Sequence, residues 1–121
     1  MRLQILHVPG CPGADLLETR LAPLLAAHPG IELTRQVLVD QAGAERAGMT
    51  GSPTLLADGT DPFARPGQHA SVSCRLYPDE HGRQGPAPSP DQLRRALGLL
   101  PRGRLAPVSP YRGGARCPAR A

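Results

Sequence analysis

The fold follows from one stretch near the start of the chain, which reads Leu3-Gln4-Ile5-Leu6-His7-Val8-Pro9-Gly10-Cys11-Pro12. Residues 3–8 form a short apolar run with β-branched members, bounded by a proline and a glycine, and this pattern predicts a buried strand. Leucines then recur at helical spacing on one face, which predicts a helix from about Cys11 to the stop at His28-Pro29-Gly30. A cysteine is therefore expected where a strand turns into a helix.

This position predicts a reactive thiol at Cys11. Unpaired backbone N–H groups and the positive end of the helix dipole both favour a thiolate over a thiol at a helix start. Pro9, Gly10 and Pro12 would shape the loop around it. The alternative is a cysteine that only packs, and the placement favours the reactive interpretation.

The rest of the chain continues as an α/β pattern. Residues 31–39 predict a second strand, parallel to the first because the two are joined by a crossover helix. Asp40 is expected to cap a short helix over residues 41–47, and Thr54-Leu55-Leu56-Ala57 predicts a third strand that ends in the turn Asp58-Gly59.

The last two expected elements follow a long loop. Residues 71–77 alternate between polar and apolar side chains, which predicts a hairpin partner for the third strand. Ser89 and Pro90 are typical of the N-cap and the first position of a helix, and Pro101 would end that helix.

The resulting order, β-α-β-α-β-β-α, resembles the thioredoxin fold over about residues 2 to 100. The resemblance implies a single domain with a mixed central sheet flanked by helices. It also implies a reactive cysteine at the first strand-to-helix turn and a cis-proline that packs beside it. Cys11 matches the cysteine, and Pro53 in Gly51-Ser52-Pro53-Thr54 matches the proline. The family's usual C-x-x-C pair is replaced by Cys11-Pro12-Gly13-Ala14, so the usual resolving thiol is missing.

A closer resemblance rests on four segments, which are His7-Val8-Pro9-Gly10-Cys11-Pro12, Gly51-Ser52-Pro53-Thr54-Leu55-Leu56, Asp58-Gly59-Thr60-Asp61-Pro62-Phe63-Ala64 and Ser73-Cys74-Arg75-Leu76-Tyr77. They are similar to small actinobacterial thioredoxin-like proteins, some of which carry an alkylmercury lyase label. This likeness implies a thiol or soft-metal role. The sequence shows no match to the catalytic core of the lyases, so lyase activity ranks below both thiol chemistry and soft-metal binding.

Cys74 has two interpretations of equal weight. It is a small hydrophobe buried in its strand, or it acts together with Cys11. In the second case the two thiols form a disulfide, which needs Cα atoms within roughly 7 Å, or clamp a soft cation such as Hg(II), Cu(I) or Zn(II). No other cofactor is expected. His7 is interpreted as a packed, hydrogen-bonded histidine and not as a base, whereas Asp61 and His69 lie in a loop that could reach the thiol.

Two functions of different classes remain open. In the first, Cys11 is the nucleophile of thiol–disulfide or electrophile chemistry, and its partner is a thiol- or disulfide-bearing protein or a small electrophile. In the second, the protein is a non-catalytic module that binds a soft metal or a partner chain through the same surface. The oligomeric state is left open by the sequence.

The net charge of +4 belongs to the end of the chain. Residues 1 to 100 carry nine Arg against ten acidic residues, whereas residues 101–121 carry five Arg and no acidic residue. That Pro/Gly-rich segment, which holds Cys117, predicts a disordered tail and no specific nucleic-acid partner. No signal-like or membrane-spanning run is visible, so a cytoplasmic protein with reduced thiols is expected.

Overall fold

The computed structural model describes residues 1–99, so the predicted tail over residues 101–121 and Cys117 lie outside the described residues. The described chain is a mixed α/β structure with three helices and several small sheets. Its elements are, in order, β1 (Arg2–His7), α1 (Pro12–Ala27), β2 (Glu32–Val37), α2 (Gln41–Ala47), β3 (Thr50–Ser52), β4 (Thr54–Ala57), β5 (Ser71–Cys74), β6 (Tyr77–Pro78), β7 (Gln84–Gly85) and α3 (Pro90–Leu97).

A three-stranded mixed sheet in the order β2-β1-β4 forms the centre. β1 runs parallel to β2 and antiparallel to β4, with Ile5 opposite Arg35 on one side and Leu55 on the other. The predicted β-α-β unit is therefore confirmed. β2 is one of the two edge strands, and most of its side chains are exposed, including Val37 at 52%.

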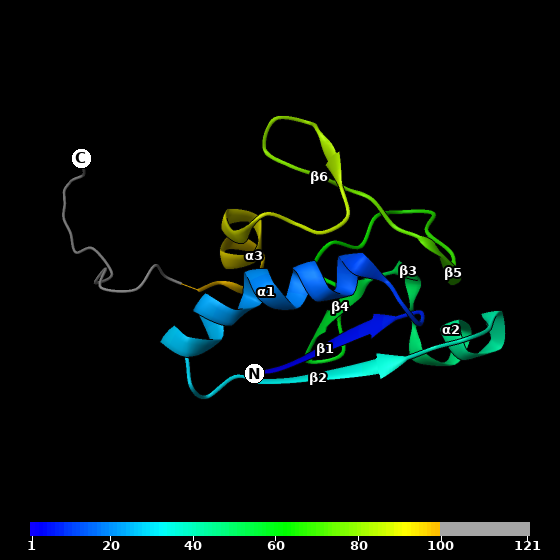
Figure 1. Ribbon diagram of the computed structural model, residues 1–121, viewed down its shortest axis with the longest axis horizontal. Helices are drawn as coiled ribbons and strands as arrows, with labels where there is room; N and C mark the ends of the chain where they lie inside the picture. The colour runs from blue at the N-terminus through cyan, green and yellow to red at the C-terminus, as the bar shows by residue number, and fades with distance from the viewer. Residues whose placement is uncertain (100–121) are drawn as a thin grey trace.

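The main core lies between this sheet and two helices. α1 runs along one face of the sheet, and α3 packs against α1 (Figure 1). The buried side chains of this core come from β1, α1, β4 and α3 and include Leu3, Ile5, Leu17, Leu21, Leu55, Leu93 and Leu97. α1 continues through Pro23 as one helix, so this proline does not break the helix.

A second, smaller core sits under α2 and contains Leu6, Leu38, Ala44 and Met49. The predicted cap of α2 is confirmed, because the carboxylate of Asp40 accepts a hydrogen bond of 2.8 Å from the Gly43 N–H. The predicted cap of α3 is confirmed by a capping box between Ser89 and Gln92. α3 ends at Leu97, before Pro101, because Gly98 adopts a left-handed conformation with φ of +69°.

The predicted hairpin between residues 71–77 and the third strand is wrong. β5 pairs in parallel with β3, a short strand that the sequence pattern did not reveal. Pro53, which has no N–H, separates β3 from β4, and Gly51 within β3 has a φ of +117°. The backbone N–H of Arg75 then bonds to the carbonyl of Ser52, and Tyr77 belongs to a separate pair, β6 with β7.

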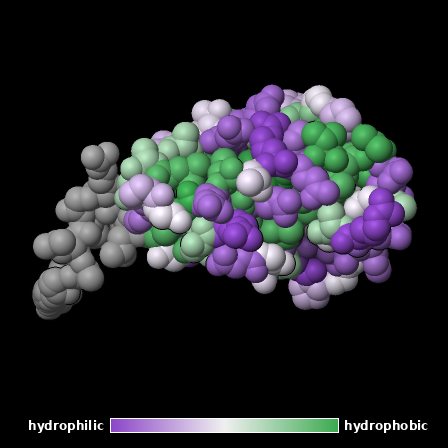
Figure 2. All heavy atoms as spheres, turned by 90° about the horizontal axis from the view of Figure 1, so that it is seen from below, coloured by the Kyte–Doolittle hydropathy of each residue, from purple (hydrophilic) through white to green (hydrophobic). Residues whose placement is uncertain are grey.

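The end of β1, the start of α1, β3 and β5 come together at one end of the molecule (Figure 1). Figure 2 shows apolar surface at the end that lies away from the grey segment, and Val37 and Val39 are exposed where β2 ends. Within residues 1–99, no helix combines the length and the apolar character needed to cross a membrane.

Candidate functional site

Cys11 is the N-cap residue of α1, as the sequence predicts. Its backbone is extended, with φ of −75° and ψ of 111°, and Pro12 fills the first helical position. Its side chain makes no capping hydrogen bond, whereas its carbonyl accepts one from the Ala14 N–H at 3.2 Å. The thiol is half-buried against the main core and is not in a disulfide. The thiol of Cys11 therefore lies at the helix start but does not cap the helix.

The cis-proline implied by the family resemblance is present at the Ser52–Pro53 bond. It lies directly against the first turn of α1. A β-carbon built on Gly13 would lie 2.9 Å from Pro53 Cδ and 2.7 Å from the carbonyl oxygen of Pro86. Only a glycine fits that approach without a shift of its neighbours. Gly13 is a site residue that the sequence reasoning missed, although it follows Cys11 by two positions.

Hydrogen bonds from three directions hold the segment around Pro53. The Val8 N–H donates to Ser52 Oγ at 3.0 Å, which ties the segment to the end of β1. The hydroxyl of Tyr77 donates to the Pro53 carbonyl at 2.5 Å, and Thr54 Oγ1 donates to the Gly51 carbonyl at 2.6 Å. Ser52, Pro53 and Thr54 are all buried, and the bonds donated by Tyr77 and Thr54 form away from water.

Behind this segment lies a buried ion pair that the sequence did not reveal. Arg75 and Asp61 meet at 2.8 Å, and their side chains are only 6% and 12% exposed. The guanidinium also donates to Thr50 Oγ1 and to the carbonyl of Phe63, at 3.1 and 2.8 Å. Asp61, which could have faced the thiol, is therefore used to hold Arg75. The alternation in residues 71–77 did not indicate which of its two faces would be buried.

Tyr77 packs against this ion pair. The guanidinium of Arg75 stacks 4.6 Å from the centre of the Tyr77 ring, and the Phe63 ring meets it edge-on. Burial raises the pKa of Tyr77 well above its ordinary value, the positive charge of Arg75 opposes the shift, and the negative charges of Asp61 and Cys11 add to it.

Cys74 lies on β5 with its backbone opposite Ser52, the residue before the cis-proline. It is exposed, so the interpretation of Cys74 as a buried small hydrophobe is wrong. Cys11 and Cys74 are both free and form no disulfide with each other. Among residues 1–99, no group of three or more His, Cys, Asp or Glu side chains is placed to hold a metal ion.

His7 is packed and hydrogen-bonded, as predicted. Its Nε2 accepts from Arg35 Nε at 3.2 Å, which assigns the proton to Nδ1, and Nδ1 lies 2.9 Å from the Val8 carbonyl. Arg35 in turn pairs with Asp15 and Glu18 on α1. His69 is exposed.

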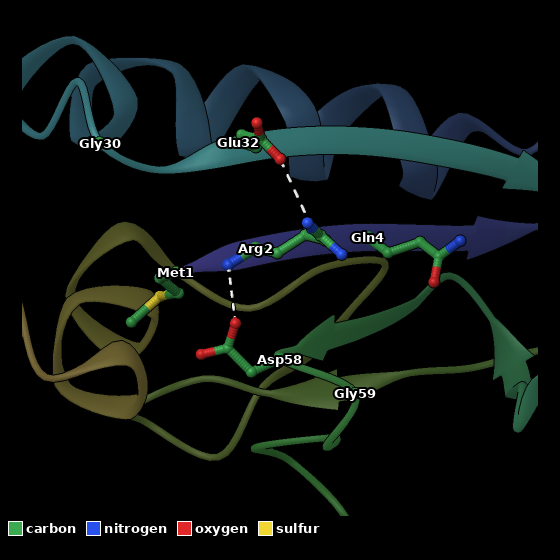
Figure 3. Close-up of a pocket in the computed structure, with 7 residues that line it drawn as sticks. All are labelled: Met1, Arg2, Gln4, Gly30, Glu32, Asp58 and Gly59. Carbon is green, nitrogen blue, oxygen red and sulfur yellow. Dashed lines mark hydrogen bonds and ion pairs between the residues drawn. The ribbon is translucent and has the colours of Figure 1, made fainter.

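A polar cavity of about 560 Å³ lies at the opposite end of β1 (Figure 3). The side chain of Arg2 pairs with Glu32 at 3.4 Å across it, and the Arg2 N–H donates to Asp58 Oδ1 at 2.8 Å. Both charged side chains of that pair are more than two-thirds exposed. None of the predicted site residues lines this cavity, so it is separate from the site around Cys11.

Comparison of the chain with protein-family models, with curated proteins and with solved structures finds no match. Its function is therefore inferred from the residues around Cys11 and Pro53.

Proposed function

We propose that this chain is a thioredoxin-like thiol protein in which Cys11 is the nucleophile for thiol–disulfide or electrophile chemistry. One observation carries the proposal. The cis Ser52–Pro53 segment lies against Gly13, in the first turn of the helix that Cys11 begins. A β-α-β unit with an added antiparallel strand, and with α1 and α3 packed together, supports a thioredoxin-like arrangement.

The surroundings of Cys11 suit a nucleophile. Its side chain is free of a capping bond, and the helix start provides backbone N–H groups that stabilise a thiolate. The segment that packs against the first turn of α1 is held by bonds from Val8 and Tyr77, so Cys11 begins a helix that rests on a fixed support. Such preorganisation lowers the cost of orienting the reacting groups.

The proposed step is an exchange between sulfurs. The Cys11 thiolate attacks one sulfur of a substrate disulfide, that S–S bond breaks, and the other sulfur leaves as a thiolate that takes a proton from water. Ala14 stands where the family has its second cysteine, so a second thiolate from elsewhere must attack the mixed disulfide. A small external thiolate attacks the substrate sulfur of the mixed disulfide. The bond between that sulfur and Cys11 breaks, Cys11 leaves as a thiolate, and a new disulfide joins the external sulfur to the substrate sulfur. Such thiols are present in the cytoplasm, the compartment that we propose.

A soft-metal or partner-binding module is the second candidate. Two free thiols, Cys11 and Cys74, support it. Ser52 links the segments that carry them, because its hydroxyl accepts a hydrogen bond from the Val8 N–H and its backbone lies opposite Cys74 on β5. Thiolates favour soft cations such as Hg(II) and Cu(I).

One experiment separates the two. The full chain and its variants Cys11→Ser, Cys74→Ser and Cys117→Ser are mixed with an aromatic disulfide and excess small thiol, and release of the aromatic thiolate is followed by absorbance. The thiol function predicts repeated turnover that only Cys11→Ser abolishes. Loss with Cys74→Ser as well would make Cys74 the resolving thiol. Turnover no faster than that of a free cysteine peptide, with Hg(II) binding that needs both Cys11 and Cys74, would replace the thiol function by the metal-binding one.

A further inference from the structure

A second cavity, of about 290 Å³, lies between the loop after β4, the start of β6 and α3. Its walls are largely apolar and include Phe63, Leu76, Tyr77 and Pro78. Leu76 is 54% exposed, so the cavity has apolar surface that a ligand could cover. The cavity is separate from Cys11, which is not among its lining residues.

Most polar groups of this cavity already have partners. The Tyr77 hydroxyl bonds to Pro53, and the Gln92 side chain bonds to the carbonyl of Pro78 at 2.7 Å and to the Ser89 N–H at 2.9 Å. The charge of Arg75 is balanced by Asp61. These groups shape the cavity but have little capacity left for a ligand.

Arg65 is the exception. Its side chain is exposed and lines the cavity, and it forms no ion pair with another residue of the described part of the chain. Its backbone N–H is held by Gln68 Oε1 at 2.8 Å, which anchors the loop that presents it. No acidic side chain is among the described lining residues, so the cavity combines apolar walls with one unbalanced positive charge.

We propose that this cavity binds a small aromatic carboxylate, with the ring against Phe63 and Leu76 and the carboxylate on Arg65. The size is adequate, because a cavity of about 150 Å³ can hold benzene and this one leaves room for a short acid chain. A guanidinium suits a carboxylate because its planar fork donates two parallel hydrogen bonds. The ligand is a free small molecule, since the site is one concave cavity and not an extended groove.

The test is an NMR titration of the full chain with 3-phenylpropanoate and with the uncharged 3-phenylpropanamide. The acid should bind about three- to fivefold more tightly than the amide, as expected for one exposed ion pair. Arg65→Gln should remove that difference. Arg46→Gln is the matched control, because Arg46 is also exposed and also forms no ion pair among the described residues. Leu76→Ser should weaken both ligands by a similar factor.

Several results would overturn the assignment. Equal binding of acid and amide, or an acid affinity unchanged by Arg65→Gln, would exclude the carboxylate. Absence of shifts around Phe63 and Leu76 with either ligand would exclude the site. If the peptide Gly-Gly-Phe bound more tightly than 3-phenylpropanoate, the ligand would be the end of a peptide and not a free small molecule. Cys11→Ser should leave all affinities unchanged, so the outcome does not depend on the thiol function.

Discussion

Tyr77 and Pro53 are joined by a hydrogen bond of 2.5 Å, in which a buried phenol donates to the carbonyl of the cis-proline. The two residues are far apart in sequence: Tyr77 belongs to β6, whereas Pro53 lies between β3 and β4. The bond makes β6 part of the support of the thiol site, because Pro53 in turn lies against the helix that Cys11 begins.

Replacing the phenol tests this support. Tyr77→Phe keeps the ring against Phe63 and Arg75 but leaves the Pro53 carbonyl without its donor. An unsatisfied buried acceptor costs about 1–3 kcal/mol, so the free energy of unfolding in urea should fall by that amount. An unchanged value would mean that water or another donor replaces the hydroxyl.

The same residue predicts a loss of stability in alkali. Burial raises the pKa of Tyr77 in the folded protein, whereas an unfolded tyrosine ionises near about pH 10. Above that pH the unfolded state binds fewer protons than the folded state, so the stability contributed by Tyr77 declines as pH rises. Urea unfolding at pH 9 and 11 should show a larger decline for the native chain than for Tyr77→Phe. Equal declines would contradict the prediction.

The buried ion pair between Arg75 and Asp61 should contribute far more to the free energy of unfolding than the exposed ion pair between Arg2 and Glu32. Asp61→Asn leaves the guanidinium of Arg75 buried without its counter-charge, which costs about 3–5 kcal/mol. Glu32→Gln is the control, because it breaks an exposed pair with Arg2 that contributes about 0–1 kcal/mol. Chemical denaturation of both variants gives the comparison, and similar losses would show that the buried pair has no special role.

Contact between Gly13 and Pro53 predicts the effect of a single methyl group. Gly13→Ala should lower the free energy of unfolding by about 1–3 kcal/mol, because the methyl meets the Pro53 ring and the Pro86 carbonyl. It should also slow the reaction of Cys11, since the turn must shift. Gly30→Ala is the matched control, with nothing within 4 Å of the added carbon. If both variants denature at the same urea concentration, the first turn of α1 has room for the methyl and the contact does not constrain it.

Elements built from local signals could be predicted from the sequence. β1, the helix after Cys11 and the caps at Asp40 and Ser89 each follow from periodicity or a capping residue within a few positions. The resemblance to a known family added the cis-proline at Pro53, which no local rule distinguishes from a trans one.

Contacts between distant segments could not be predicted. The pairing of β5 with β3 depends on Gly51, whose positive φ is not visible in the sequence. Burial of Arg75 depends on Asp61, which lies across a loop, so the alternation of residues 71–77 did not indicate which face was internal. Gly13 was missed for the same reason, because its two close neighbours, Pro53 and Pro86, come from remote parts of the chain.

We propose that the turn between β1 and α1 activates Cys11. Alkylation of the variant with Cys74→Ser and Cys117→Ser, followed by mass spectrometry of the Cys11 peptide over a range of pH, tests it most directly. At pH 7 Cys11 should react at least about tenfold faster than a free peptide of the same sequence, because in the folded chain its thiol begins α1 without a capping bond, in a turn held against Pro53. A rate equal to that of the free peptide at every pH would contradict the claim.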